Sequence, residues 1–190
     1  MIAGHFAFAA AVKSRTPQIP LWSLMLACQW MDVVFIPLFG FQLERIVPLP
    51  GTAPGAYGQG VIYADYTHSV VGALVLSAIF AVATGIPWGR RAGLILGGVV
   101  FSHWVLDLVT HRQDMPLLPG NAGDLPRLGF GLWRWPAATA AVELAMVLAG
   151  SWLYWRAALR AAPGSRRAHV AGGMMLGFGL LTLGLNVAGM

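Results

Sequence analysis

The sequence predicts an all-α fold: a polytopic transmembrane helical bundle with about five spans plus a short N-terminal half-spanning helix. Of its 190 residues, 57% are hydrophobic and 10% are charged, whereas roughly a quarter of the residues of a soluble domain are charged. The mean hydropathy is +0.68. No polar linker separates two parts that could fold independently, so residues 1–190 are predicted to form a single integral membrane domain.

The helices are predicted from apolar runs and from the residues that interrupt them. Residues 2–12 are apolar but would reach only about 17 Å at ~1.5 Å per residue, against a hydrocarbon core of ~30 Å. They should form a half-spanning or buried helix. Full spans are expected over 20–41, 67–87, 92–111, 136–158 and 169–189. They are separated by Gly/Pro-rich loops at 42–64 and 112–135 and by basic turns at 88–91 and 159–168.

Local signals refine these spans. Thr67 or Asp65 is expected to cap the helix over 67–87, because a side-chain oxygen can accept from the free N–H groups of a first turn. Two glycine pairs at GxxxG spacing predict close helix approach. They are Gly93 with Gly97, and Gly173 with Gly177.

The basic residues are divided unequally between the two ends of the predicted bundle. Eight fall on one side and four on the other: Lys13, Arg15, Arg90, Arg91, Arg156, Arg160, Arg166 and Arg167 against Arg45, Arg112, Arg127 and Arg134. The positive-inside rule makes the first side cytoplasmic. The basic residues that give the net charge of +5 therefore set the orientation in the membrane. No basic tract alternates with aromatic residues, so no nucleic-acid partner is expected.

A polar stripe lies at the end of the span over 92–111. His103, Asp107 and His111 are four residues apart, so on a helix they project from one face, with a drift of about 40° per step. An ionisable group in an apolar helix costs about 2.5 to 3.5 kcal/mol near a bilayer centre and usually marks a functional site. Trp133 and Trp135, by contrast, are expected to belong to the aromatic belt.

Other segments supply partners for this stripe. Imidazole together with carboxylate suits Zn²⁺ or a similar divalent metal, and one or two ions are consistent with the number of ligands. The predicted metal ligands are His5, Asp32, His68, His103, Asp107 and His111. Glu143 and Asp107 are the predicted catalytic residues, with Glu143 as a metal ligand or a base. Arg112 and Arg127 are predicted to bind an anionic substrate.

Structural alternatives exist for several of these residues. His5 could simply bond to a neighbouring helix, and Glu143 could do so as a neutral acid. His111 could reach the membrane interface, and Asp114 could only begin a turn. Asp32 is different, because no arginine lies deep enough within a span to pair with it, which favours a metal or a shared proton.

A family resemblance rests on short motifs, in chain order: Gly4-His5, Asp32, Thr67-His68-Ser69, Ser102-His103 with Asp107, Pro116-Leu117-Leu118-Pro119, and Glu143. Over most of residues 1–158 these resemble the YdjM-like family of bacterial inner-membrane metal-dependent hydrolases. The order of His and Asp is more loosely similar to zinc-dependent phospholipase C and P1 nuclease. Asp32 stands alone where the family has two aspartates, and Thr139 precedes Glu143 where the phospholipases have histidine. The resemblance thus implies one or two metals, not three.

Together these observations predict a membrane-embedded, metal-dependent hydrolase of an ester or phosphoester in a membrane lipid or lipid-linked substrate. The resemblance implies a multi-pass protein of the bacterial inner membrane, and the basic residues put its site toward the outer side. Two other functions stay open. One is a small transporter or permease that uses the His/Asp residues as an ion or proton relay. The other is a non-enzymatic membrane scaffold with a structural metal.

Overall fold

The computed structural model describes residues 1–189, which form a helical bundle with one small antiparallel sheet. The α-helices are α1 (Ile2–Lys13), α2 (Leu21–Cys28), α3 (Trp30–Gly40), α4 (Val70–Trp88), α5 (Arg90–Thr110), α6 (Pro136–Ala161) and α7 (Arg166–Val187). Strands β1 (Arg45–Pro48) and β2 (Gly60–Tyr63) pair in a hairpin, with Arg45 opposite Tyr63. Short 3₁₀ turns occupy Pro119–Asn121 and Leu132–Arg134.

The predicted fold class is confirmed. Helices α4, α5, α6 and α7 are each long and apolar enough to cross a membrane. The bent pair α2 and α3 passes the same criterion together and would make a fifth span, while α1 is the short apolar helix expected at the N-terminus. The protein is therefore a membrane protein with four or five spans.

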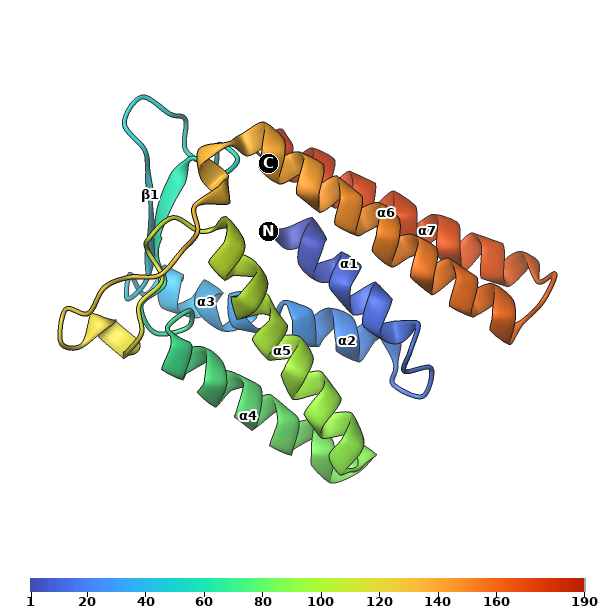
Figure 1. The fold of residues 1–190 in the computed structure, drawn as a ribbon. Coiled ribbons are helices and arrows are strands. Elements are labelled where there is room, and N and C mark those ends of the chain that lie inside the picture. The colour runs from blue at the N-terminus through green and yellow to red at the C-terminus, as the bar shows by residue number, and fades with distance from the viewer. Residues whose placement is uncertain (190) are drawn as a thin grey trace.

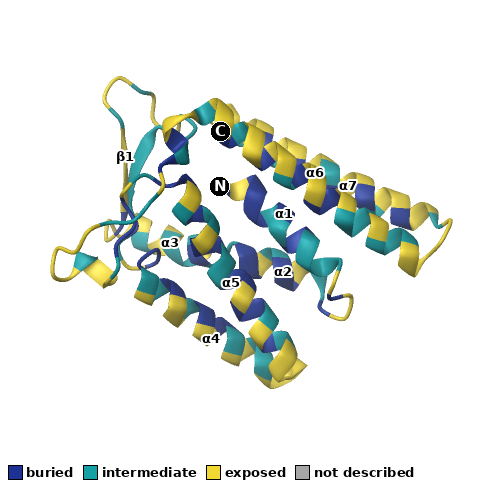
Figure 2. Cartoon of the chain, in the orientation of Figure 1, coloured by how far each residue is buried: buried dark blue, intermediate teal, exposed yellow. Residues whose placement is uncertain are grey.

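Helix α1 lies in the middle of the bundle, between the α6–α7 pair and the helices α2 and α5 (Figure 1). Its buried positions include Ala3, Ala7, Ala9 and Ala10, whose small side chains let neighbouring helices approach closely. Gly150 of α6 adjoins the Ala7 carbonyl. Many exposed apolar residues lie on α4, α6 and α7 (Figure 2), as expected for helices that contact lipid.

The two ends of the bundle differ in character. The turns between α1 and α2, α4 and α5, and α6 and α7 lie at one end, and the β hairpin with the loop over 112–135 lies at the other (Figure 1). We call the end with the β hairpin the hairpin end. Among residues 1–189, the buried histidine, aspartate and glutamate side chains all come from this end: His5, Glu44, His68, His103, Asp107, His111, Asp114 and Glu143.

The span predicted over 20–41 is not continuous, since α2 and α3 meet at Gln29 with a bend of 48°. No glycine or proline at the break predicts the bend. Contacts from elsewhere in the chain stabilise the break instead. His103 Nδ1 lies 2.7 Å from the Cys28 carbonyl oxygen, and the side-chain amide of Gln29 donates to the carbonyl of Ile2. The break is thus a tertiary feature.

Two local predictions were wrong. Ser69, not Thr67 or Asp65, caps α4, because its hydroxyl accepts from the Gly72 N–H at 2.9 Å. Gly93 and Gly97 do pack closely on α4, but side chains at Gly173 and Gly177 would meet nothing within 4 Å among the described residues. On α7 the close contacts belong to other glycines, Gly172 against Trp155 and Gly179 against Val147.

Candidate metal centre

Side chains from three helices and one loop meet at the hairpin end. His5 comes from α1, Asp32 from the first turn of α3, and His68 from the loop just before α4. His103 and Asp107 lie on the buried face of α5, and His111 ends that helix. All six predicted metal ligands therefore lie together; we call them the His/Asp cluster. Five are almost fully buried, whereas the Asp32 side chain is 38% exposed.

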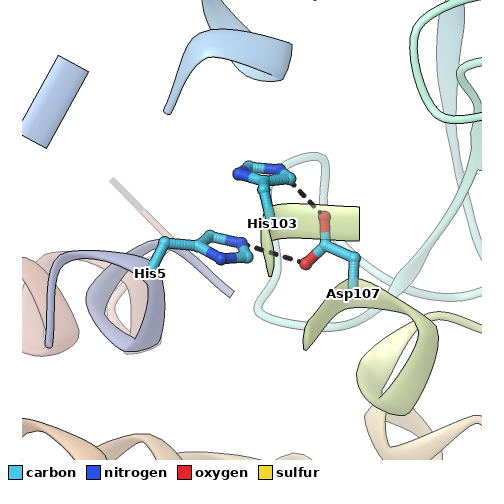
Figure 3. Close-up of side chains that lie close together, drawn as sticks. All are labelled: His5, His103 and Asp107. Carbon is cyan, nitrogen blue, oxygen red and sulfur yellow. Dashed lines mark hydrogen bonds and ion pairs between the residues drawn. The ribbon is translucent and has the colours of Figure 1, made fainter. Parts of the chain in front are cut away.

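Asp107 lies at the centre of the cluster. Its Oδ1 is 3.1 Å from His5 Nε2 and 3.5 Å from the nitrogen of Met1. Its Oδ2 is 3.1 Å from His103 Nε2 and 3.7 Å from the Nε2 atoms of both His68 and His111. Figure 3 shows each carboxylate oxygen directed at one imidazole, with the rings of His5 and His103 stacked at a centroid distance of 3.7 Å. One carboxylate thus connects four rings.

The break between α2 and α3 orients His103. In a continuous helix the Cys28 carbonyl would accept from the N–H of residue 32, but here it lies 2.7 Å from His103 Nδ1. Since a carbonyl can only accept, we assign the ring hydrogen to Nδ1. The Nε2 lone pair of His103 then points into the cluster, as in a histidine prepared to bind a metal.

A second chain of hydrogen bonds orients His68. Glu44 is buried and accepts from the backbone N–H groups of Tyr66 and Thr67 and from the Thr67 hydroxyl. Because that hydroxyl donates to Glu44, it can accept from His68 Nδ1, 2.8 Å away. Burial raises the pKa of Glu44, while these hydrogen bonds act in the opposite direction. With its ring hydrogen on Nδ1, His68 keeps Nε2 as a free acceptor, as His103 does.

His111 is held by its own carboxylate. Asp114 Oδ1 lies 3.0 Å from His111 Nδ1, and the ring packs against Trp133 at a centroid distance of 4.4 Å. Trp133 is buried here and so does not belong to an aromatic belt, whereas Trp135 is 61% exposed. His68, His103 and His111 therefore each have an acceptor at Nδ1, which is the usual arrangement around metal-binding histidines.

The free acceptors converge. Nε2 of His68 and Nε2 of His103 are 3.4 Å apart, and Asp32 Oδ1 is 3.6 Å from each. With both ring hydrogens on Nδ1, no hydrogen lies between these atoms, and such a group of lone pairs repels unless a cation lies among them. Two sets have ligand atoms close enough for one ion: Asp32, His68 and His103, and His5, His103 and Asp107. The donor chemistry thus fits a divalent metal.

His5 is placed differently from the other histidines. Its Nε2 faces Asp107 Oδ1, and its buried Nδ1 has no hydrogen-bond partner within residues 1–189. It therefore lacks the acceptor that fixes the rings of His68, His103 and His111.

A cavity of about 440 Å³ adjoins the cluster. Asp32, His68, Asp107 and His111 form its polar end, and most of the remaining wall is apolar. This volume and composition are typical of small-molecule sites, which span ~300–1,000 Å³ and combine apolar walls with a few polar groups. The cluster therefore has access to a compartment that can hold a ligand.

Two predicted site residues, Glu143 and Arg112, have partners outside the His/Asp cluster. Glu143 is fully buried and accepts from the Gly4 N–H at 3.1 Å and from the Tyr57 hydroxyl. Arg112 donates to the carbonyls of Gly58 and Trp133. These contacts join the N-terminal helix and the loops to the bundle. The catalytic role of Glu143 and the substrate role of Arg112 stay predictions.

Arg127 makes an ion pair with Asp65 and also donates to the Asp114 carbonyl. The Asp65 side chain raises the pKa of Arg127, chiefly by hydrogen bonding. Neither Arg112 nor Arg127 is among the described residues that line the cavity, and substrate binding by Arg127 stays a prediction.

Little in the sequence indicates the groups that orient the histidines. Glu44 lies in a loop with no motif around it, and the Cys28 carbonyl is backbone. The prediction for Asp114 was a turn residue, although its spacing of three from His111 also indicates that the two can pair.

The chain matches no family model, no curated protein and no solved structure. The assignment of this site therefore rests on the geometry of its side chains.

Proposed function

We propose that this protein is a membrane-embedded, metal-dependent hydrolase that cleaves an ester or phosphoester. The observation that carries the proposal is the approach of two histidine Nε2 atoms to 3.4 Å, with both Nδ1 atoms bound elsewhere and two carboxylates beside them. A proton would satisfy one pair of these acceptors, whereas a divalent cation satisfies all of them at once.

Four residues would hold the ion: Asp32, His68, His103 and Asp107. Bound there, a divalent metal polarises a carbonyl or phosphoryl oxygen and lowers the pKa of water toward ~7. We favour one ion over two, because both possible ligand sets use His103, and its Nδ1 is already bound to Cys28. Two imidazoles with carboxylate favour zinc among the common divalent metals.

His111 is proposed to move the proton. It lines the cavity beside the cluster, and its Nε2 is 3.7 Å from Asp107 Oδ2. Asp114 fixes the ring through Nδ1 and would stabilise the imidazolium that forms when Nε2 accepts a proton from the attacking water. The ring would then return this proton to the leaving oxygen as the ester or phosphoester bond breaks. His5, which contacts Asp107 Oδ1, is proposed to position that carboxylate instead of binding the ion.

Hydrolysis is favoured over transport by the distribution of the polar groups. The buried histidine, aspartate and glutamate side chains within residues 1–189 come from the hairpin end, whereas a relay would need such groups along a path to the opposite end. The basic residues of the turns lie at that opposite end. By the positive-inside rule the site would face outward, and the resemblance to the YdjM-like family makes the bacterial inner membrane the proposed location.

The proposal is tested with detergent-purified protein reconstituted with Zn²⁺ and assayed on p-nitrophenyl esters and phosphoesters. His111→Gln should retain metal and lose hydrolysis, whereas His103→Ala should lose both. His169→Gln is the control, because His169 is exposed on α7. Unchanged hydrolysis in His103→Ala would overturn the proposal, and so would a native protein that binds zinc but cleaves none of these compounds.

A further inference from the structure

The wall of the cavity comes mainly from α3 and the β hairpin. Phe35 and Ile36 line it from α3, Ile46 from β1 and Ile62 from β2, and Trp133 closes it next to His111. The apolar compartment is thus continuous with the polar end formed by the His/Asp cluster.

Two lining residues are also on the outer surface of the protein. Ile36 is 66% exposed and Ile46 is 46% exposed. Ile36 belongs to α3, which with α2 forms the bent pair apolar enough to cross a membrane, and its neighbours Val33 and Phe39 are exposed apolar residues as well. Because these lining residues also reach the outer surface, we place the mouth of the cavity between Ile36 and Ile46, on a surface suited to lipid chains.

We propose that this cavity receives the hydrocarbon chain of a membrane lipid, which enters sideways between α3 and β1. The lipid's ester or phosphoester group then lies at Asp32 and His68, the polar end of the same cavity. This inference rests on the proposed hydrolase function and identifies its substrate class as a bilayer lipid.

The apolar wall can hold a lipid chain and, among the described residues, has no charged side chain for a water-soluble anion away from the His/Asp cluster. Lipid chains are about as apolar as isoleucine, so the chain gains little free energy by leaving the bilayer for the cavity. Weak binding is sufficient because the bilayer supplies the substrate at high local concentration. Arg112 and Arg127 are bound to other groups, so selectivity depends on the cluster and not on a pocket for a soluble anion.

The test uses proteoliposomes that contain a phosphatidylglycerol with a photoreactive diazirine in its acyl chain, followed by peptide mass spectrometry. The native protein should be labelled at the cavity wall near Ile62 and the buried Trp133, and also at exposed residues of α4 such as Ile79. Ile36→Trp should fill the mouth and abolish labelling of the cavity wall while Ile79 stays labelled.

Val33→Trp is the matched control, because Val33 is 40% exposed on the same helix and is not among the described residues that line the cavity. It should leave the cavity wall labelled. If Ile36→Trp does not fold, Ile46→Trp blocks the mouth from the other side. An unlabelled wall in the native protein, or a wall labelled equally in the mouth variants, would overturn the inference.

Metal content and p-nitrophenyl ester hydrolysis of the same samples separate the two proposals. Native protein that binds metal and hydrolyses soluble esters but shows no label inside the cavity contradicts the lipid inference alone. A labelled cavity in a protein without metal or hydrolysis contradicts the hydrolase function, and with it the role of the lipid as substrate.

Discussion

Two buried carboxylates at the hairpin end, Asp107 and Glu143, differ in what surrounds them. Glu143 accepts from two donors, the Gly4 N–H and the Tyr57 hydroxyl. Burial, followed by the bond to Glu143, raises the pKa of Tyr57, so its hydroxyl stays protonated and continues to donate. Asp107 Oδ2 instead faces the Nε2 atoms of His68, His103 and His111.

Under the proposed function, the contrast separates a carboxylate that joins helices from one that would hold a metal. Around Glu143 the hydrogen-bond donors are present, so its partners join helix α1 and the loop at Tyr57 to α6 without any further group. Around Asp107 Oδ2 the neighbouring Nε2 atoms carry no hydrogen in the tautomers assigned above, and the proposed cation would stabilise them together. Burial and charge alone do not separate the two residues; the direction of the hydrogen bonds does.

The largest loss of zinc affinity is expected when the carboxylate charge of Asp107 is removed. Asp107→Asn keeps the size of the side chain but replaces a charged ligand by an amide. We expect its affinity for Zn²⁺, measured by competition with a chromogenic chelator, to fall by more than the roughly 10- to 100-fold that loss of an orienting residue costs. Affinity within a few-fold of the native value would show that Asp107 does not hold the ion.

A smaller effect is expected from the residue that orients His68. Thr67→Val removes the acceptor at His68 Nδ1 with little change in volume, so zinc affinity should fall by about 10- to 100-fold. Thr139→Val is the matched control: Thr139 is equally buried, and its hydroxyl donates to the carbonyls of Leu132 and Trp135. The control should cost about 1 kcal/mol of stability and leave zinc affinity unchanged. Equal zinc affinity in both variants would contradict the assigned orientation of His68.

The smallest effect on zinc binding is expected at Glu143. Glu143→Gln places an amide donor against an existing donor, so the free energy of unfolding in detergent should fall by about 1–3 kcal/mol. Zinc affinity of the folded protein should be unchanged, because no hydrogen bond or ion pair joins Glu143 to the proposed ligands among residues 1–189. A large loss of zinc with unchanged stability would restore Glu143 to the metal site.

Much of the fold could be predicted, because a helix that crosses a membrane must be long and apolar and its ends carry basic or turn residues. The spacing of His103, Asp107 and His111 also placed three site residues on one face of α5. The break at Gln29 and the role of Glu44 could not be predicted, since both depend on partners far along the chain. The same holds for the glycines of α7, where spacing indicated Gly173 and Gly177 but packing uses Gly172 and Gly179.

The most direct test of the metal centre is the metal content of detergent-purified protein, measured by elemental mass spectrometry for the native chain and for His103→Ala. His103 is common to both possible ligand sets, so its loss should remove the ion whichever set is used. We expect close to one divalent metal per native chain and none in the variant. A native protein that is folded and metal-free, or a variant that retains the ion, would contradict it.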